Sequence, residues 1–437
     1  MMSTKSVRTV LGLLVAVSVM AGLTARPTVF AAPPVQGDES VTLRIWDQFT
    51  DEGLNAAAEV IYAAFEAANP NIQIEREVAT REQMIATANT ALASGTGPDL
   101  IYFDTGPGNA GLLAESGLLM PLDDYAAKHG WDERIFQWAR DRATFDGQLY
   151  GLGGEIEFIG MYVNQTLLDE TGLAFPENAE DLPEFCAQAQ EQGLIPIAFG
   201  DAPGWQSFHQ FGMVANNALG IDEMERLLFG GEADWTRPEL VAAVTLFFET
   251  MLDAGCFIPD VNAVNYDDAN ALFFSGQALA HSTGTWLIGD IERGAPDYEI
   301  TMRPFPAVAG NTPVLPAGLG SAWFMSASTA HPDEAALFLD HLFSDESVKT
   351  WLTAGRIIPP VVFDPATAEL SPLQSFAVET LQGVEQGETD LGFYIDTAAP
   401  EAFNALMQDG FQAVLAKTKT PEQQLADLQQ AWDEGQS

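Results

Sequence analysis

Between residues 41 and 103 the spacing of hydrophobic positions switches between the two-residue period of strands and the longer period of helices. Alternation and β-forming side chains predict strands, whereas apolar residues three or four apart predict helices. The pattern predicts strands at 41–46, 72–78 and 100–103, with one helix in each interval. Thr50 is the expected N-cap of the first helix, and Thr80-Arg-Glu-Gln83 has the form of a capping box for the second. This order is a βαβαβ unit with right-handed parallel crossovers.

The third predicted strand leads into a polar, glycine-rich loop. Residues 100–103 are an apolar run of strand length, and Asp104-Thr-Gly-Pro-Gly108 then turns the chain. In open α/β sheets ligands bind at the carboxyl ends of the strands. We therefore expect a binding site beside Asp104.

The rest of the chain predicts a second α/β region. Residues 148–155 and 156–164 are two glycine-rich extended segments, as a crossover between two lobes requires. Helices are then expected at 181–191, 205–217, 238–254 and 268–275, with strands at 195–199, 278–283 and 318–325. At 437 residues the chain exceeds what one hydrophobic core usually serves, so we expect two lobes.

Residues 1–31 have the features of a secretory signal peptide. Lys5 and Arg8 form a positive region, and residues 10–23 carry no charge. Cleavage fits best after Ala31, with Ala25 as the alternative. The uncharged run is too short for a comfortable membrane span, so we expect export to the periplasm or the extracellular face of the membrane. Residues 32–40 are a polar linker, and no cysteine lies near the cleavage region to carry a lipid anchor.

Acidic residues far outnumber basic ones. The chain has 62 Asp and Glu against 18 Lys and Arg, and its formal net charge is −44. This balance argues against nucleic acid and anionic membranes as partners. We interpret the acid excess as a solvated surface, with a cationic ligand as the alternative. The five histidines are scattered without a ligand-spacing motif, so no metal site is expected.

The chain has two cysteines, Cys186 and Cys256. Two cysteines in an exported protein indicate one disulfide, and two buried thiols are the alternative. We predict the disulfide.

Several short motifs together resemble those of bacterial extracellular solute-binding proteins. Gly97-Pro-Asp99 with Leu-Ile-Tyr-Phe after it, followed by Leu112-Leu-Ala-Glu-Ser-Gly-Leu-Leu-Met-Pro-Leu-Asp123, resembles a signature of the family 1, maltose-binding-protein-like group. Further similar motifs follow in the family's order: Tyr150-Gly-Leu, Met161-Tyr-Val-Asn164, Gly284-Thr-Trp286, His331-Pro-Asp-Glu-Ala, Phe338-Leu-Asp-His-Leu and Gly355-Arg-Ile-Ile-Pro359. The resemblance covers roughly residues 41–435.

The resemblance implies an α/β, two-lobe periplasmic-binding-protein-like fold of type II. Each lobe would be a mostly parallel sheet flanked by helices, and crossover hinge strands would join the lobes. We expect residues 41–150 plus 277–322 in the N-terminal lobe and 151–276 plus 323–437 in the C-terminal lobe. The implied function is capture of a sugar or oligosaccharide between the lobes of a monomer and delivery to the permease of an ATP-binding-cassette (ABC) transporter. No catalysis and no organic cofactor are implied.

The resemblance and the chemistry of sugars indicate four main site residues. Aromatic rings cover the apolar faces of sugars, and carboxylates or amides bind their hydroxyls. Trp286 matches the family's stacking tryptophan, and Glu157 falls on its ligand-binding glutamate. Glu155 shares a face with Glu157 in an extended segment. Trp205 follows Ala-Pro-Gly at a helix start.

Residues at loops and strand ends supply the remaining candidates. Glycines among them would let backbone approach a ligand closely. These candidates are Asp47, Gln48, Asp104, Gly318, Gly320, Ser321 and Tyr394. Every candidate also has a structural interpretation: core packing for the aromatic rings, a solvated hinge for the glutamates, and a turn or bulge for the glycines.

Two other functions compete with sugar binding. An exported glycoside hydrolase would use Glu155 and Glu157 as its two carboxylates, but such pairs normally come from different elements. The same fold with a cationic solute such as a polyamine would suit acidic residues near aromatic rings. Ferric iron is disfavoured because the chain has no clustered pair of tyrosines.

Overall fold

The structure is a computed structural model that describes residues 40–437 except 232, 365, 367, 386–390 and 436–437. The predicted signal peptide and residues 32–39 of the predicted linker lie outside the described residues. Residues 40–437 form one compact unit. No helix in this described part is both long and apolar enough to cross a membrane.

Five strands form the first sheet, in the order β2-β1-β3-β12-β6. β1 pairs in parallel with β2 and β3, whereas β12 runs antiparallel to β3 and β6. The strands are β1 Val41–Asp47, β2 Ile72–Val78, β3 Leu100–Asp104, β6 Gly151–Gly153 and β12 Ser321–Met325. The predicted βαβαβ unit is confirmed, with α1 (Glu52–Ala68) and α2 (Arg81–Ala93) as its helices.

The two helix caps of this unit had different outcomes. The capping box between Thr80 and Gln83 is confirmed. The N-cap predicted at Thr50 is wrong, because the Asp51 carboxylate accepts from the backbone N–H groups of residues 53 and 54 instead. Threonine and aspartate are both good N-cap residues, so the sequence pattern alone could not decide which of two neighbouring residues begins the helix.

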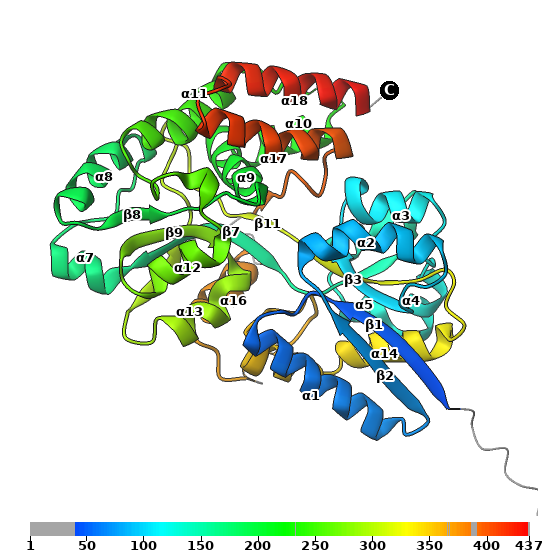
Figure 1. Cartoon of the computed structure of the whole chain (residues 1–437). Coiled ribbons are helices and arrows are strands. Elements are labelled where there is room, and N and C mark those ends of the chain that lie inside the picture. Colours follow the sequence, from blue (N-terminus) through cyan, green and yellow to red (C-terminus); the bar gives the residue numbers. More distant parts are fainter. Residues whose placement is uncertain (1–39, 232, 365, 367, 386–390, 436–437) are drawn as a thin grey trace, which may run out of the picture. The chain divides into compact units, whose positions relative to one another are not determined.

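Strand β3 is buried on both faces, as its apolar run predicted. Leu100 and Tyr102 point into one hydrophobic cluster, and Ile101 and Phe103 point into another. This alternation follows from the two-residue period of a strand. Helices α1 and α14 (Pro332–Leu342) pack on the first face, and α2 and α3 (Leu112–Glu115) pack on the second, as Figure 1 shows.

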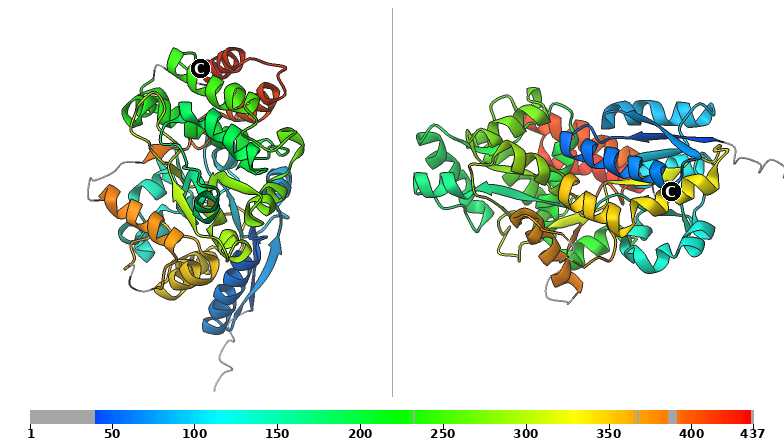
Figure 2. Two further views of the ribbon diagram at one scale, coloured as in Figure 1. Left: turned by 90° about the vertical axis from the view of Figure 1, so that its left-hand side faces the viewer. Right: turned by 90° about the horizontal axis from the view of Figure 1, so that it is seen from below.

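Six strands form the second sheet, in the order β13-β11-β7-β9-β8 with β10 also paired to β7. The strands are β7 Glu157–Asn164, β8 Ile195–Ala198, β9 Ala278–Gly284, β10 Ile300–Arg303, β11 Pro316–Gly318 and β13 Gly392–Phe393. Strands β7, β8, β9 and β11 lie close together in Figure 1, and Figure 2 turns the same ribbon to two further views. A second hydrophobic cluster covers one face of this sheet, with Met161, Ile197 and Leu279 among its members. Phe158 and Tyr162, which point to the other face of β7, belong to the cluster that also contains Leu100 and Tyr102.

The remaining elements are short or lie on the outside of the sheets. A two-stranded ribbon pairs β4 (Thr144–Phe145) with β5 (Gln148–Leu149). The other helices are α4 Asp123–His129, α5 Trp131–Arg134, α6 Gln137–Asp141, α7 Gln165–Thr171, α8 Leu182–Glu191, α9 Trp205–Leu219, α10 Ile221–Phe229, α11 Pro238–Thr245, α12 Tyr266–Phe274, α13 Ile288–Gly294, α15 Asp345–Thr350, α16 Pro372–Glu385, α17 Glu401–Leu415 and α18 Pro421–Gly435.

The α/β class with two sheets flanked by helices is confirmed, but two details of the prediction are corrected. The sheets are mixed rather than mostly parallel, because β12 is antiparallel to both its neighbours and β7 is antiparallel to β9, β10 and β11. The predicted lobe boundaries also put 277–322 with the first sheet and 323–437 with the second. In the structure β9, β10 and β11 lie in the second sheet, whereas β12 and β6 lie in the first, although residues 151–153 of β6 fall within the second predicted lobe.

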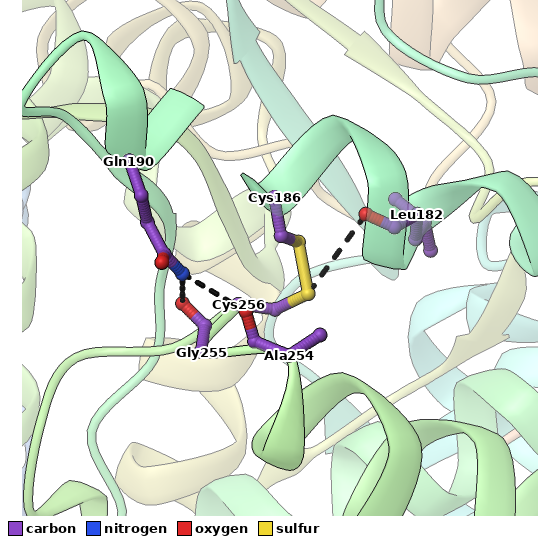
Figure 3. Close-up of a disulfide and its surroundings, with 6 residues drawn as sticks. All are labelled: Leu182, Cys186, Gln190, Ala254, Gly255 and Cys256. Carbon is purple, nitrogen blue, oxygen red and sulfur yellow. Dashed lines mark hydrogen bonds between the residues drawn. A yellow bond between two sulfur atoms is a disulfide. The ribbon is translucent and has the colours of Figure 1, made fainter. Parts of the chain in front are cut away.

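Cys186 and Cys256 form a disulfide, as predicted. It joins α8 to the loop after the turn of helix at residues 246–251, and both cysteines are fully buried. Their Cα atoms are 5.0 Å apart, and 70 positions separate them in the sequence. Gln190 supports the same junction, since its side-chain amide donates to the carbonyl oxygens of Ala254 and Gly255 (Figure 3).

Replacing both cysteines, as Cys186→Ser with Cys256→Ser, should lower the free energy of unfolding by about 4 kcal/mol in the loop-entropy model. The cause is that the unfolded chain regains the freedom of a loop that the disulfide closes. Urea unfolding of the wild-type protein and the double variant, with and without a reductant, measures this difference. A wild-type unfolding curve that the reductant leaves unchanged would contradict the prediction, and the double variant controls for other effects of the reductant.

Candidate functional site

One cavity of about 660 Å³ lies at the carboxyl ends of parallel strands from both sheets. Residues that follow β1 and the last residues of β3, Tyr102 and Asp104, line it from the first sheet, and residues that follow β8 and β9 line it from the second. The first turns of α2, α9 and α12 complete its wall. The carboxyl end of β3 therefore contributes to a site, in agreement with the rule for α/β sheets, whereas the loop after it does not line the cavity.

An aromatic cluster, made of Trp205, His209, Tyr266 and Trp286, lines the cavity on the side of the second sheet. The rings of Trp205 and Tyr266 have centroids 4.8 Å apart, and those of Trp205 and Trp286 are 6.1 Å apart. The indole N–H of Trp286 donates to the Tyr266 hydroxyl over 2.8 Å. That hydrogen bond fixes the angle of the Trp286 ring.

His209 is a neutral member of the aromatic cluster. Burial, followed by the positive charge of Arg81, lowers the pKa of His209 to about 3. Its ring centroid lies 5.4 Å from that of Trp286. At neutral pH this histidine therefore adds an uncharged ring to the wall.

The side of the first sheet presents a second pair of rings, Phe49 and Tyr102, with centroids 4.9 Å apart. Gln48 also lines the cavity, and its amide donates to the backbone carbonyl of Tyr102 over 3.2 Å. The buried Tyr102 hydroxyl has no hydrogen-bond partner among the described residues. It is thus a free polar group in the wall of the cavity.

Asp104 is held in an ion pair at the end of β3. Its Oδ2 atom lies 2.5 Å from a guanidinium nitrogen of Arg81, in the first turn of α2. Ser321 stands opposite Asp104 in the antiparallel pair of β12 with β3, and its hydroxyl donates to Oδ1 over 3.2 Å. Most of the hydrogen-bonding capacity of Asp104 is therefore used inside the protein.

Glu157 opens β7 and is 8% exposed. Its Oε2 atom accepts from the backbone N–H of Gly320 over 3.1 Å. A Cβ at position 320 would lie 2.5 Å from the carboxylate, so only glycine admits this contact. Burial, then the charges of Glu155 and Asp104, raise the pKa of Glu157 well above its ordinary value.

Glu155 is 6% exposed and lines the cavity beside Glu157. Neither a hydrogen bond nor an ion pair joins its carboxylate to another described residue. Burial, with the charge of Asp51 as a smaller cause, raises the pKa of Glu155 to about 8. Burial of this carboxylate therefore favours its protonated form.

The structure brings eight of the eleven predicted binding residues to the cavity. They are Gln48, Asp104, Glu155, Glu157, Trp205, Trp286, Gly320 and Ser321. Sugar contact by these residues stays a prediction, but their convergence from six separate stretches of sequence agrees with the expected site.

The structure places the other three candidates, Asp47, Gly318 and Tyr394, outside the cavity. Asp47 is fully buried on the far side of its strand end, where Arg76 Nε lies 2.6 Å from its Oδ2 and Tyr62 donates to the same oxygen. Gly318 lies under the Tyr394 ring, which a Cβ there would approach to 2.6 Å. Tyr394 is itself buried, at 2% exposure.

Sequence reasoning missed several residues of the wall. They include Phe49, Asp51, Arg81, Tyr102, His209, Tyr266, Asp290 and Asp396. Arg81 could have been found, because it lies in the first turn of a helix whose capping box was recognised. Tyr266 gave no signal, since its contact with Trp286 joins positions that only the fold brings together.

Two α/β sheets with a shared cavity of aromatic rings and carboxylates define a ligand-binding protein. The sequence comparison makes this class specific: the family model for bacterial extracellular solute-binding proteins matches residues 61–367, and the chain belongs to that family. The predicted family is thereby confirmed.

Individual relatives agree with this assignment. A Pyrococcus horikoshii protein named "Uncharacterized ABC transporter extracellular-binding protein" is 23% identical over 390 residues, 86% of this chain and 84% of the relative. A Brucella melitensis biotype 1 protein named "Probable sugar-binding periplasmic protein" is 24% identical over 289 residues, 64% of this chain and 66% of the relative. The solved structure of a chitin oligosaccharide binding protein has the same fold, with a TM-score of 0.80 and 21% identity over 91% of this chain and 99% of that one.

The variant Glu155→Gln should flatten the pH dependence of stability. The pKa of Glu155 is raised from 4.5 to about 8 in the folded protein, so between these values the folded state keeps a proton that the unfolded chain releases. The stability from this group is complete below the ordinary pKa and is lost as pH rises through the folded pKa, at about 1.4 kcal/mol per pH unit. In Glu155→Gln this decrease of stability with rising pH is absent, because an amide does not titrate.

Denaturant unfolding at a series of pH values, for the wild-type protein and for Glu155→Gln, measures the difference in slope. Glu133→Gln, at an exposed carboxylate, is the matched control and should follow the wild-type protein. Parallel curves for the wild-type protein and Glu155→Gln would show that Glu155 titrates normally.

Proposed function

We propose that this protein captures a sugar or oligosaccharide in the cavity between the two sheets and delivers it to the permease of an ABC transporter. The arrangement of the aromatic cluster opposite Asp104, Glu155 and Glu157 carries the proposal. The names of two relatives, an ABC transporter extracellular-binding protein and a probable sugar-binding periplasmic protein, support it.

The wall of the cavity matches the two kinds of surface on a pyranose ring. Trp205 and Trp286 can cover the apolar face of a ring, where C–H groups meet the aromatic π-system. Carboxylates accept hydrogen bonds from ring hydroxyls, and charge-assisted bonds of this kind are the stronger ones. Arg81 adds a donor for oxygen atoms beside Asp104.

We propose that each sheet is the centre of one lobe and that the segments between the sheets form the hinge. The chain passes from β6 to β7 and returns from β11 to β12. β6 pairs with β12 in the first sheet, and β7 pairs with β11 in the second. Within this proposal the predicted lobes are changed, because β9, β10 and β11 belong to the lobe of the second sheet, and β6, β12 and α14 belong to the lobe of the first. Ligand that contacts both lobes would favour the closed state through its higher affinity for that state.

We further propose that binding occurs without turnover, in an exported monomer. Membership of a solute-binding family supports binding rather than catalysis. Glu155 and Glu157 are two residues apart on one segment, whereas glycosidase carboxylates normally approach a substrate from different elements. Recovery of unchanged oligosaccharide after incubation with the protein tests this point.

A thermal-shift screen against mono- and oligosaccharides, with polyamines included, tests the function directly. A ligand that binds only the folded state raises the melting temperature by mass action. We expect at least one sugar to do so. A shift with polyamines and none with any sugar would replace the proposed function by cationic-solute binding.

The variant Trp286→Ala should then weaken binding of the sugar found in the screen by about 1–3 kcal/mol, because a central aromatic contact is lost. Titration calorimetry of the wild-type protein and the variant gives the two dissociation constants. Trp138→Ala, at a partly buried tryptophan away from the cavity, is the control for loss of an indole ring. An unchanged dissociation constant for Trp286→Ala would remove this residue from the site.

A further inference from the structure

The cavity has far more negative than positive groups in its wall. Arg81 is the one arginine or lysine among the residues that line it, and His209 is neutral. The acidic residues of the wall are Asp51, Glu82, Asp104, Glu155, Glu157, Asp267, Asp290 and Asp396. Their partners decide which of these charges remain available to a ligand.

Three of the acidic residues have cationic partners inside the protein. Asp104 pairs with Arg81. Asp51 and Asp290 both pair with Arg293, at 2.9 and 2.6 Å. Glu82 and Asp267 are exposed on the rim, where water solvates their charge. The positive charge of Arg81 also acts on the half-buried Asp396. Glu155 and Glu157 are neither paired with a cation nor solvated in this way.

Glu155 and Glu157 together receive one hydrogen bond from the described residues, the backbone N–H of Gly320. Both are more than nine-tenths buried, and both face the cavity. The surface acidity of the chain does not explain them, because a solubilising charge has to be in contact with water. Two buried carboxylates with so few donors are costly unless a cation or protons compensate them.

We propose, on the basis of the proposed function, that the ligand is an amino sugar whose free amino group binds as an ammonium ion between Glu155 and Glu157. An ammonium group supplies three N–H donors and one positive charge, whereas a hydroxyl supplies one donor and no charge. The unpartnered hydroxyl of Tyr102 is a further polar group in the same wall.

Two observations favour an amino sugar over other cations. Within the described residues, no group of three acidic, histidine or cysteine side chains is placed to hold a metal ion. A linear polyamine has no flat face to lie against Trp205 and Trp286, whereas a sugar ring has one. The amino sugar therefore uses both the aromatic cluster and the two glutamates.

Titration calorimetry near neutral pH, with glucosamine oligomers and N-acetylglucosamine oligomers of equal length, tests the proposal. Glucosamine, galactosamine and their N-acetyl counterparts extend the same comparison to single rings. Acetylation removes the charge and keeps the rest of the sugar. We expect the free amine to bind at least about tenfold more tightly than its acetylated counterpart.

Glu155→Gln and Glu157→Gln should each reduce this preference by about tenfold, because an amide is uncharged. Glu133→Gln, at an exposed site away from the cavity, should leave the preference unchanged. Thermal unfolding of all variants establishes that they are folded.

The outcomes separate this inference from the proposed function. Equal or tighter binding of the acetylated or neutral sugars would overturn the amino-sugar inference and leave sugar capture standing. A preference for the amine that both glutamine variants retain would also overturn it, because the amino group would then bind elsewhere. Binding of spermidine with no sugar bound would overturn both the inference and the proposed function.

Discussion

The structure depends on the place where two segments of the chain, residues 154–156 and 319–320, pass side by side between the two sheets. β6 pairs with β12 on one side of this crossing, and β7 pairs with β11 on the other. The backbone N–H of Gly154 donates to the carbonyl of Ser321, and the N–H of Gly320 donates to the Glu157 carboxylate. These bonds tie the two crossing segments together, and residues of both segments line the cavity.

The same crossing carries the buried carboxylates of the site. Glu155 and Glu157 lie on the first crossing segment, and Gly320 and Ser321 lie on the second. Burial raises the pKa of both glutamates. The segments that join the two sheets therefore also set the electrostatics of the cavity wall.

Local sequence signals predicted the elements well where short-range physics decides them. The capping box at Thr80 and the buried run of β3 are set by neighbouring residues, and both are confirmed. Long-range pairing was not readable from the pattern. Which sheet receives β9 or β12 depends on contacts between distant segments, and the pattern of each strand alone fits either sheet.

The same distinction applies to the site. Gln48 and Asp47 are adjacent at the end of β1, yet Gln48 faces the cavity and Asp47 is held by Arg76, which is 29 residues away in the sequence. Trp286 was found through a motif at a strand end, whereas its partner Tyr266 became visible only in the fold. Residues at the carboxyl edge of a sheet could be predicted, and the ion pairs that remove some of them from the site could not.

Small-angle X-ray scattering tests the central claim that ligand binds between the two lobes and closes them. The radius of gyration of the protein saturated with the sugar that gives the largest thermal shift should be smaller than that of the free protein, because the closed state is more compact. Tight binding of that sugar with no change in the radius of gyration would contradict the account.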